Sequence, residues 1–313
     1  MKIVFFGTPP FAAEVLKALI ESSHEVLAIV TRPDKPKGRS QKLLPSAVKE
    51  TAQELCPHIP LYQPAKASTD EFAEQLKALE PDCFVVVAYG EIIKKNLLDV
   101  PKKYCLNVHA SLLPQYRGAA PMQRALMNGE KKTGITIMEM VEKMDAGDMF
   151  EMAAVSVDEE MTLGELEVKL CQLAKPALLK VLGQIEQGIE KKSPQDPAEV
   201  TFAPKITQED RQINWSRPAE EVHNQIRALS PQPGAYCFAQ AGDEVKRLSI
   251  KKARVVSDRE GKPGDTLVQE KDKWIVACGQ KALALLEIQL EGKKSLSIET
   301  FLRGQSRPFR IKL

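Results

Sequence analysis

The chain has 313 residues, of which 43% are hydrophobic and 27% charged, and its formal net charge at pH 7 is +2. These values are typical of a globular protein and argue against a disordered chain. No apolar run approaches the roughly 20 residues that a membrane-spanning helix needs, so we expect a soluble protein. Since one compact domain usually holds about 100–200 residues, the length predicts two domains.

The cysteines and the amino terminus bear on where the protein works. Its six cysteines include no Cys-x-x-Cys pair and are accompanied by only four histidines, so their spacing predicts no metal site. The apolar stretch in residues 1–7 is too short for a signal peptide and has no small-residue cleavage site. We therefore expect a cytoplasmic protein with reduced thiols and no membrane association.

The first part of the chain alternates between short apolar runs and amphipathic stretches. The apolar runs cover residues 2–6, 26–30, 83–88 and 104–109, and the amphipathic stretches cover residues 11–20, 70–79 and 91–98. Strands that alternate with helices pack as a parallel sheet with helices on both faces. The pattern predicts a doubly wound, mostly parallel α/β domain of the Rossmann-like kind.

A hairpin and a long helix complete this domain. Residues 134–140 and 149–157 flank the turn-forming residues 145–148, which predicts an antiparallel hairpin at the edge of the sheet. Amphipathic spacing from Thr162 to Ile189 predicts a long helix. Thr162 is its expected N-cap, and Glu165 three residues later completes a capping box.

The end of the chain has a different pattern. Residues 190–204 carry three prolines and no periodicity, so we interpret them as a linker between a catalytic domain, 1–189, and a C-terminal domain, 205–313. Short strand candidates separated by turns predict a small OB-like β-barrel. They cover residues 235–238, 245–253, 266–269, 274–277 and 282–289. The C-terminal domain also holds 20 Lys/Arg against 14 Asp/Glu, a weak indication of a polyanionic partner.

Two strand ends carry different signals for chemistry. The turn after the first strand has only Gly7, where a dinucleotide-binding protein has Gly-x-Gly-x-x-Gly, so no pyrophosphate site is expected there. Asn107 and His109, two residues apart on a strand, project to the same side at its carboxyl end. Either residue alone would be typical of one that ties down a loop. As a pair at the edge where open α/β sheets bind ligands, they favour a functional site.

Residues 107–114 and 134–148 together closely resemble the folate-dependent formyltransferase family. By itself, the turn at residues 145–148 would be an ordinary hairpin turn. The resemblance implies that Asn107, His109 and Asp145 form a catalytic triad and that 10-formyltetrahydrofolate is the cosubstrate that donates the formyl group. It also implies that Ser111, Leu112, Leu113 and Pro114 line the folate site, and we expect Tyr89 and Gly90 beside them.

Three further segments, residues 7–12, 31–46 and 226–235, are similar to the branch of this family that formylates methionyl-tRNA. This implies initiator methionyl-tRNA as the partner, a role in translation initiation and an RNA-binding barrel, and we expect a monomer. Composition alone leaves the basic loop at residues 31–46 equally consistent with a solvated surface loop. In the family the matching loop contacts the acceptor stem, so we expect RNA contacts at Arg32, Lys37, Arg39 and Lys42.

The chemistry of formyl transfer agrees with the resemblance. Attack by an amine on a formyl carbon builds negative charge on the formyl oxygen, which a hydrogen-bond donor must stabilise. Asn107 and a protonated His109 can both donate. A carboxylate beside a histidine favours its imidazolium form, which would be the role of Asp145. The sequence leaves open whether the proton passes through His109 or through a water held by Asp145.

Two alternatives remain at this stage. A formyltransferase for a small amine, such as an amino sugar nucleotide or glycinamide ribonucleotide, would share the triad and the folate site but would not require residues 205–313 or the basic loop. A non-catalytic RNA-binding protein would need none of Asn107, His109 and Asp145.

Overall fold

The computed structural model describes residues 1–37, 42–304 and 308–312, without the side chains of Lys37 and Lys42. The chain divides into two compact units, each built from three segments. Unit 1 comprises Met1–Gly118, Gly134–Val155 and Glu167–Phe202, and unit 2 comprises Ala119–Thr133, Ser156–Leu166 and Ala203–Leu313. The functional boundaries expected from the sequence, 1–189, 190–204 and 205–313, stay a prediction.

Unit 1 is organised around a seven-stranded sheet with the strand order β5-β2-β1-β6-β7-β8-β9. These strands are β1 (Lys2–Gly7), β2 (Glu25–Val30), β5 (Leu61–Tyr62), β6 (Cys83–Val87), β7 (Tyr104–His109), β8 (Lys132–Glu139) and β9 (Met149–Ser156). Strand β1 pairs in parallel with β2 and β6, β6 pairs in parallel with β7, and β8 pairs antiparallel with β7. The mostly parallel sheet with a hairpin at its edge is confirmed.

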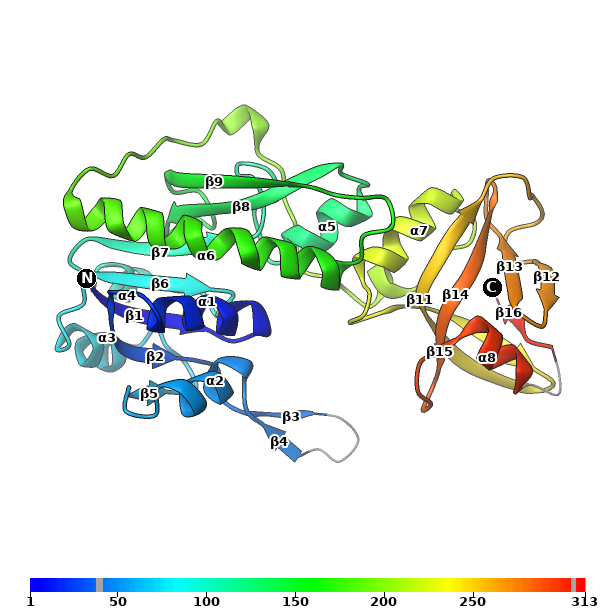
Figure 1. Ribbon diagram of the computed structural model, residues 1–313, viewed down its shortest axis with the longest axis horizontal. Helices are drawn as coiled ribbons and strands as arrows, with labels where there is room; N and C mark the ends of the chain where they lie inside the picture. The colour runs from blue at the N-terminus through cyan, green and yellow to red at the C-terminus, as the bar shows by residue number, and fades with distance from the viewer. Residues whose placement is uncertain (38–41, 305–307, 313) are drawn as a thin grey trace. The chain divides into compact units, whose positions relative to one another are not determined.

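Helices cover both faces of this sheet, which is why β1 and β6 are almost continuously apolar and buried. On one face lie α1 (Pro10–Ile20) and α6 (Leu163–Gln187), where Lys175 Nζ is 2.7 Å from a Glu14 carboxylate oxygen (Figure 1). On the other face, α3 (Asp70–Lys77) and α4 (Lys95–Leu98) share a core with the alternate side chains of β1 and β6.

Two expected helices can be compared with the structure at their starts. The capping box of α6 is confirmed, because the Thr162 N–H donates to the Glu165 carboxylate at 2.8 Å and the Glu165 N–H lies 3.4 Å from the Thr162 hydroxyl. The helix expected over residues 91–98 is wrong in its first half and begins at Lys95. The reason is that Glu91 is engaged elsewhere, since its carboxylate accepts the Ala67 N–H at 2.9 Å.

The basic loop carries structure that its composition did not predict. Strands β3 (Lys35–Lys37) and β4 (Lys42–Leu44) pair antiparallel, and α2 (Ala47–Leu55) follows them. Ser46 caps α2 by accepting the Lys49 N–H at 3.0 Å. The segment is therefore a short hairpin anchored at the start of a helix.

Unit 2 contains a curled antiparallel sheet with the order β12-β13-β14-β11-β10-β16, to which β15 adds beside β14. Its strands are β10 (Ala235–Ala241), β11 (Glu244–Val256), β12 (Thr266–Glu270), β13 (Lys273–Ala277), β14 (Ala282–Leu290), β15 (Leu296–Ser297) and β16 (Arg310–Lys312). Its helices are α5 (Pro121–Met127), α7 (Ala219–Ala228) and α8 (Ile298–Arg303). All five strands expected from the sequence are present, and the small OB-like barrel is confirmed. Trp215 and Trp274 lie in its core.

Among the helices of the described residues, none combines the length and apolar character that crossing a membrane would require.

Candidate active site

The carboxyl ends of the central strands meet at one edge of the sheet. Gly7 at the end of β1 is level with Val87 at the end of β6, and β6 runs parallel to β7, which ends at His109. The loops that follow are tied together, because the Thr8 hydroxyl donates to the Tyr89 carbonyl at 2.8 Å. This is the edge where open α/β sheets bind ligands.

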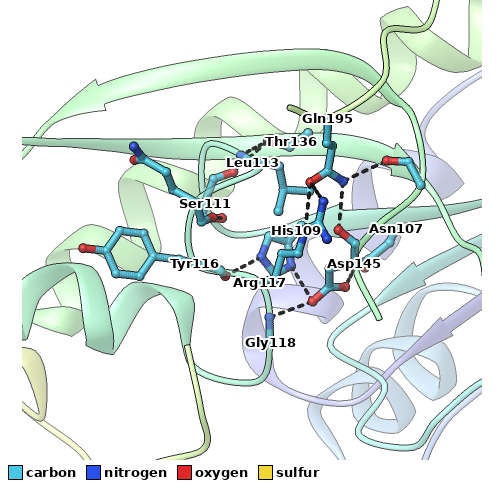
Figure 2. Close-up of polar contacts among 12 residues, drawn as sticks. Asn107, His109, Ser111, Leu113, Tyr116, Arg117, Gly118, Thr136, Asp145 and Gln195 are labelled. Atoms are coloured by element: carbon cyan, nitrogen blue, oxygen red, sulfur yellow. Dashed lines mark hydrogen bonds and ion pairs between the residues drawn. The ribbon is translucent and has the colours of Figure 1, made fainter. Parts of the chain in front are cut away.

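His109 is buried at this edge and has a partner on each ring nitrogen. Its Nε2 lies 3.0 Å from the Tyr116 carbonyl oxygen, and its Nδ1 lies 3.8 Å from Asp145 Oδ2 (Figure 2). A carbonyl only accepts, so Nε2 carries a proton. The other ring nitrogen, Nδ1, faces the Asp145 carboxylate.

Asp145 belongs to the turn between β8 and β9. Its Oδ2 accepts the Gly118 N–H at 2.8 Å, and its Oδ1 lies 3.5 Å from Asn107 Nδ2. Its φ of 49° is in the left-handed region, which non-glycine residues hold only when surrounding contacts enforce it. The structure thus brings Asn107, His109 and Asp145 together, as the sequence analysis expected, from two strand ends and a turn.

Sequence reasoning missed two buried residues beside this group. Gln195 accepts from Arg117 and donates to the carbonyl oxygens of Asp145 and Gly147 (Figure 2). Arg117 and Gln195 are only 6% and 9% exposed. No sequence signal pointed to Gln195, because it lies in the proline-rich segment that we interpreted as a linker.

The segment expected to line the folate site, residues 111–114, is held by a side chain of the neighbouring strand β8. The Thr136 hydroxyl donates to the Ser111 carbonyl at 2.7 Å and accepts the Leu113 N–H at 3.1 Å. Ser111, Leu113 and Pro114 are buried, whereas Leu112 is partly exposed. Thr136, which the sequence analysis did not single out, therefore fixes the backbone of this loop.

Tyr89 and Gly90 follow the end of β6 at the same edge. Tyr89 is buried and its ring meets Phe6 edge-on, with 5.5 Å between the ring centroids. Burial raises the pKa of the Tyr89 hydroxyl. Gly90 has a φ of +86°, and a Cβ placed on it would meet no atom within 4 Å. Of the two, Gly90 is the residue that leaves open space at the edge.

Of the four residues expected to contact RNA, the structure describes the side chain of Arg32 alone. Arg32 forms an ion pair with Glu91, and its guanidinium lies 6.0 Å from the centre of the Tyr89 ring. Arg39 lies outside the described residues, as do the side chains of Lys37 and Lys42. The Arg32 side chain therefore contacts the loop after β6 in the structure, and its role toward RNA stays a prediction.

Within the ranges that the structure describes, no group of three or more His, Cys, Asp or Glu side chains is placed to hold a metal ion.

Comparison with known proteins identifies the family. A family model described as "Formyl transferase" matches residues 1–182, and one described as "Formyl transferase, C-terminal domain" matches residues 205–306. The chain is 50% identical over 307 residues to a methionyl-tRNA formyltransferase of Protochlamydia amoebophila (strain UWE25), with 98% of this chain and 96% of the relative covered. The chain belongs to the methionyl-tRNA formyltransferase family. The resemblance seen in the sequence is confirmed.

Solved structures with low sequence identity to this chain share its fold. HypX from Aquifex aeolicus matches 98% of this chain with a TM-score of 0.67 at 20% identity, and this chain spans about half of it (49%). An N-formyltransferase from Helicobacter canadensis, solved with folinic acid and dTDP-3-aminofucose, matches 91% of this chain and 99% of its own, with a TM-score of 0.67 at 17% identity. At these identities the likeness shows the fold alone.

Proposed function

We propose that this member of the family transfers the formyl group of 10-formyltetrahydrofolate to the α-amine of initiator methionyl-tRNA, giving N-formylmethionyl-tRNA for translation initiation. The observation that carries the proposal is the meeting of Asn107, His109 and Asp145 at the carboxyl edge of the sheet. The 50% identity to a methionyl-tRNA formyltransferase, over almost the whole chain, supports the choice of substrate.

In the proposed reaction, the amine forms a C–N bond to the formyl carbon while the bond from that carbon to the folate nitrogen breaks. The amine loses a proton and the folate nitrogen gains one, so the exchange balances without a metal or an oxidant. The contact of Asn107 Nδ2 with Asp145 Oδ1 is long, at 3.5 Å, so this amide can turn toward the formyl oxygen. Removing one such donor typically costs about 100- to 1,000-fold in rate.

In this proposal, His109 and Asp145 stabilise positive charge in the site and move the proton that the amine loses. The Tyr116 carbonyl fixes the His109 ring through Nε2, so Nδ1 is the position that gains or loses a proton beside the carboxylate. Asp145 stabilises the imidazolium, and it is itself held by the Gly118 N–H. This pair supplies a proton relay within the site.

The folate cosubstrate supplies the activated formyl group when bound. The residues proposed to hold it are Ser111, Leu112, Leu113 and Pro114 on one loop and Tyr89 and Gly90 on the other. The open space at Gly90 and the partly exposed Leu112 fit a flat ring system between loops with buried supports.

For the RNA, we propose contacts from the hairpin β3–β4 and from unit 2, with Arg32, Lys37, Arg39 and Lys42 in or beside the hairpin. Function in the cytoplasm as a monomer is part of the proposal. The cytoplasmic location is supported by six cysteines that are all free and buried, as expected of thiols that stay reduced.

The test is transfer of labelled formyl from 10-formyltetrahydrofolate to aminoacylated RNA. We expect label in methionyl-tRNA that is lost on RNase treatment, and no label in uncharged tRNA. If the label appears instead in a small amine, such as an amino sugar nucleotide, that amine and not methionyl-tRNA is the substrate. The His109→Ala protein, checked for folding by circular dichroism, is the control for enzyme-dependent transfer.

A further inference from the structure

Gln195 reaches the candidate active site from a segment that carries no catalytic motif. Ser193, two residues earlier, exchanges two backbone hydrogen bonds with Met149 at the start of β9, each 2.9 Å long. This pairing holds the chain alongside the hairpin and places Gln195 next to the turn of Asp145. At this point the segment is therefore part of unit 1.

The carboxamide of Gln195 is hydrogen-bonded at every position it offers. Its Oε1 accepts from Nε and Nη2 of Arg117 at 2.9 and 2.8 Å, and its Nε2 donates to the carbonyl oxygens of Asp145 and Gly147, both at 2.8 Å (Figure 2). An amide has two acceptor lone pairs and two donor N–H groups, so these four bonds use them all. Gln195 therefore contacts protein atoms and not the substrate.

The two segments that Gln195 joins both hold candidate catalytic residues. Arg117 lies between Tyr116, whose carbonyl accepts from His109, and Gly118, whose N–H donates to the Asp145 carboxylate. On its other side Gln195 holds the turn that contains Asp145 itself. One side chain thus fastens the loop at residues 116–118 to the turn at residues 145–147.

The turn needs such a fastening because its backbone is under constraint. Asp145 has a φ of 49°, a conformation that a non-glycine residue leaves when its contacts are lost. Gly147 is pressed against β8, since a Cβ added to it would lie 2.0 Å from the Glu139 carbonyl oxygen. A relaxed turn would carry the Asp145 carboxylate away from His109 and Asn107.

We propose that Gln195 is a positioning residue for formyl transfer. It fixes the Asp145 turn against the loop at residues 116–118, and so sets the distances from the Asp145 carboxylate to His109 and Asn107. The inference rests on the proposed function, which makes these three residues catalytic.

The first test replaces Gln195 by a near-isosteric side chain without hydrogen bonds, Gln195→Met. Its matched control is Gln187→Met, at an exposed glutamine at the end of α6. We expect kcat to fall about 10- to 100-fold, because a misplacement of about 1 Å can cost about 100-fold. KM for both substrates should stay within about threefold of the parent, since Gln195 contacts neither. A kcat within about threefold of the parent, or a loss confined to KM, would overturn the proposal.

The second test separates the two sides of the amide. Gln195→Glu keeps an acceptor for Arg117 but turns the donor toward Asp145 and Gly147 into another acceptor. Only a protonated carboxyl group can donate there, so the ratio of its kcat to that of the parent should rise as the pH falls from about 8 to about 5, toward the ordinary range of a glutamate. A residue that only stabilises the fold would show no such recovery. A ratio that does not change with pH would refute the positioning role. This test uses Gln195→Glu alone, so it holds even if Gln195→Met does not fold.

A readout independent of turnover separates this inference from the proposed function. The chain has four histidines, so the ring nitrogen resonances of His109 can be followed by NMR. We expect them to move in Gln195→Met and to stay in place in Gln187→Met. If the resonances move in Gln195→Met but the parent protein does not formylate methionyl-tRNA, the result would support the positioning role of Gln195 and refute the proposed function. Unchanged resonances in Gln195→Met would refute the positioning role of Gln195, whatever the activity of the parent protein.

Discussion

Replacing Asp145 by Asn tests the charge of the candidate triad while keeping its shape. Asp145 Oδ2 lies 3.8 Å from His109 Nδ1, and the two side chains are 14% and 6% exposed. Two unit charges about 4 Å apart interact by about 4 kcal/mol at the effective dielectric constant of roughly 20 that suits such sites. Where the imidazolium forms only on the way to the transition state, the loss of this interaction raises the activation free energy and leaves the ground state unchanged. Each 1.36 kcal/mol is about tenfold, so we expect kcat to fall by about 100- to 1,000-fold.

The measurement is kcat for formylation of methionyl-tRNA at saturating folate, together with the Kd for 10-formyltetrahydrofolate from titration calorimetry. The Kd should stay within about threefold, because the lost interaction belongs to the transition state. Asp148→Asn is the matched control, since Asp148 ends the same turn but its side chain is 41% exposed and lies 3.7 Å from Lys192 Nζ. Equal losses in the two variants, or less than about a threefold loss in Asp145→Asn, would show that Asp145 is only a turn residue.

Three further outcomes are expected. Asn107→Ala should lower kcat by about 100-fold in a protein with an unchanged melting temperature, and turnover within about threefold of the parent would remove the proposed oxyanion donor. Hydrogen bonding to Arg124 lowers the pKa of Asp210 below its ordinary 3.8, so this pair stabilises the fold above that pH and ceases to do so as the pH falls through the lowered value. Asp210→Asn should therefore cost about 2 kcal/mol of unfolding free energy at pH 7 and little in strong acid, and urea titrations that show a pH-independent cost would contradict this. Gly134→Ala should destabilise by about 1–3 kcal/mol, because its Cβ would lie 2.2 Å from a carbonyl oxygen of β9, whereas Gly183→Ala, with no atom within 4 Å, is the control that should cost nothing in the same titration.

Much of the architecture was readable from local patterns. The apolar run of β1 and the alternation of helices predicted the parallel sheet, and Thr162 with Glu165 marked the start of α6 within one residue. The five barrel strands also appeared where turn residues and apolar runs predicted them. These features depend on neighbours a few residues apart, which is the range over which sequence periodicity carries information.

The candidate site was only partly readable. Asn107 and His109 share a face of one strand and were found from that pattern. Composition marked the turn at residues 145–148 only as a hairpin turn, and Asp145 was selected through the family resemblance. Their catalytic roles rest on the family resemblance and stay predictions until the variants are measured. Thr136 gave no signal, because a threonine inside a strand is common and its support of the 111–114 loop depends on β8 lying beside β7.

The sequence by itself determined the fold class, most of the strands and helices of the two sheets, and Asn107 with His109 at one sheet edge, since strand alternation, capping and turn chemistry are local. Asp145 was added to them by the family resemblance. Only the tertiary structure decided what surrounds those residues. Gln195 lies in a proline-rich segment without periodicity, and its partners Arg117 and Asp145 are 78 and 50 residues away in the chain. A hydrogen bond requires its atoms within about 3 Å and aligned, and no local pattern encodes a contact made across that separation. Only the packed fold therefore brings the buried Gln195 amide to the turn that contains Asp145.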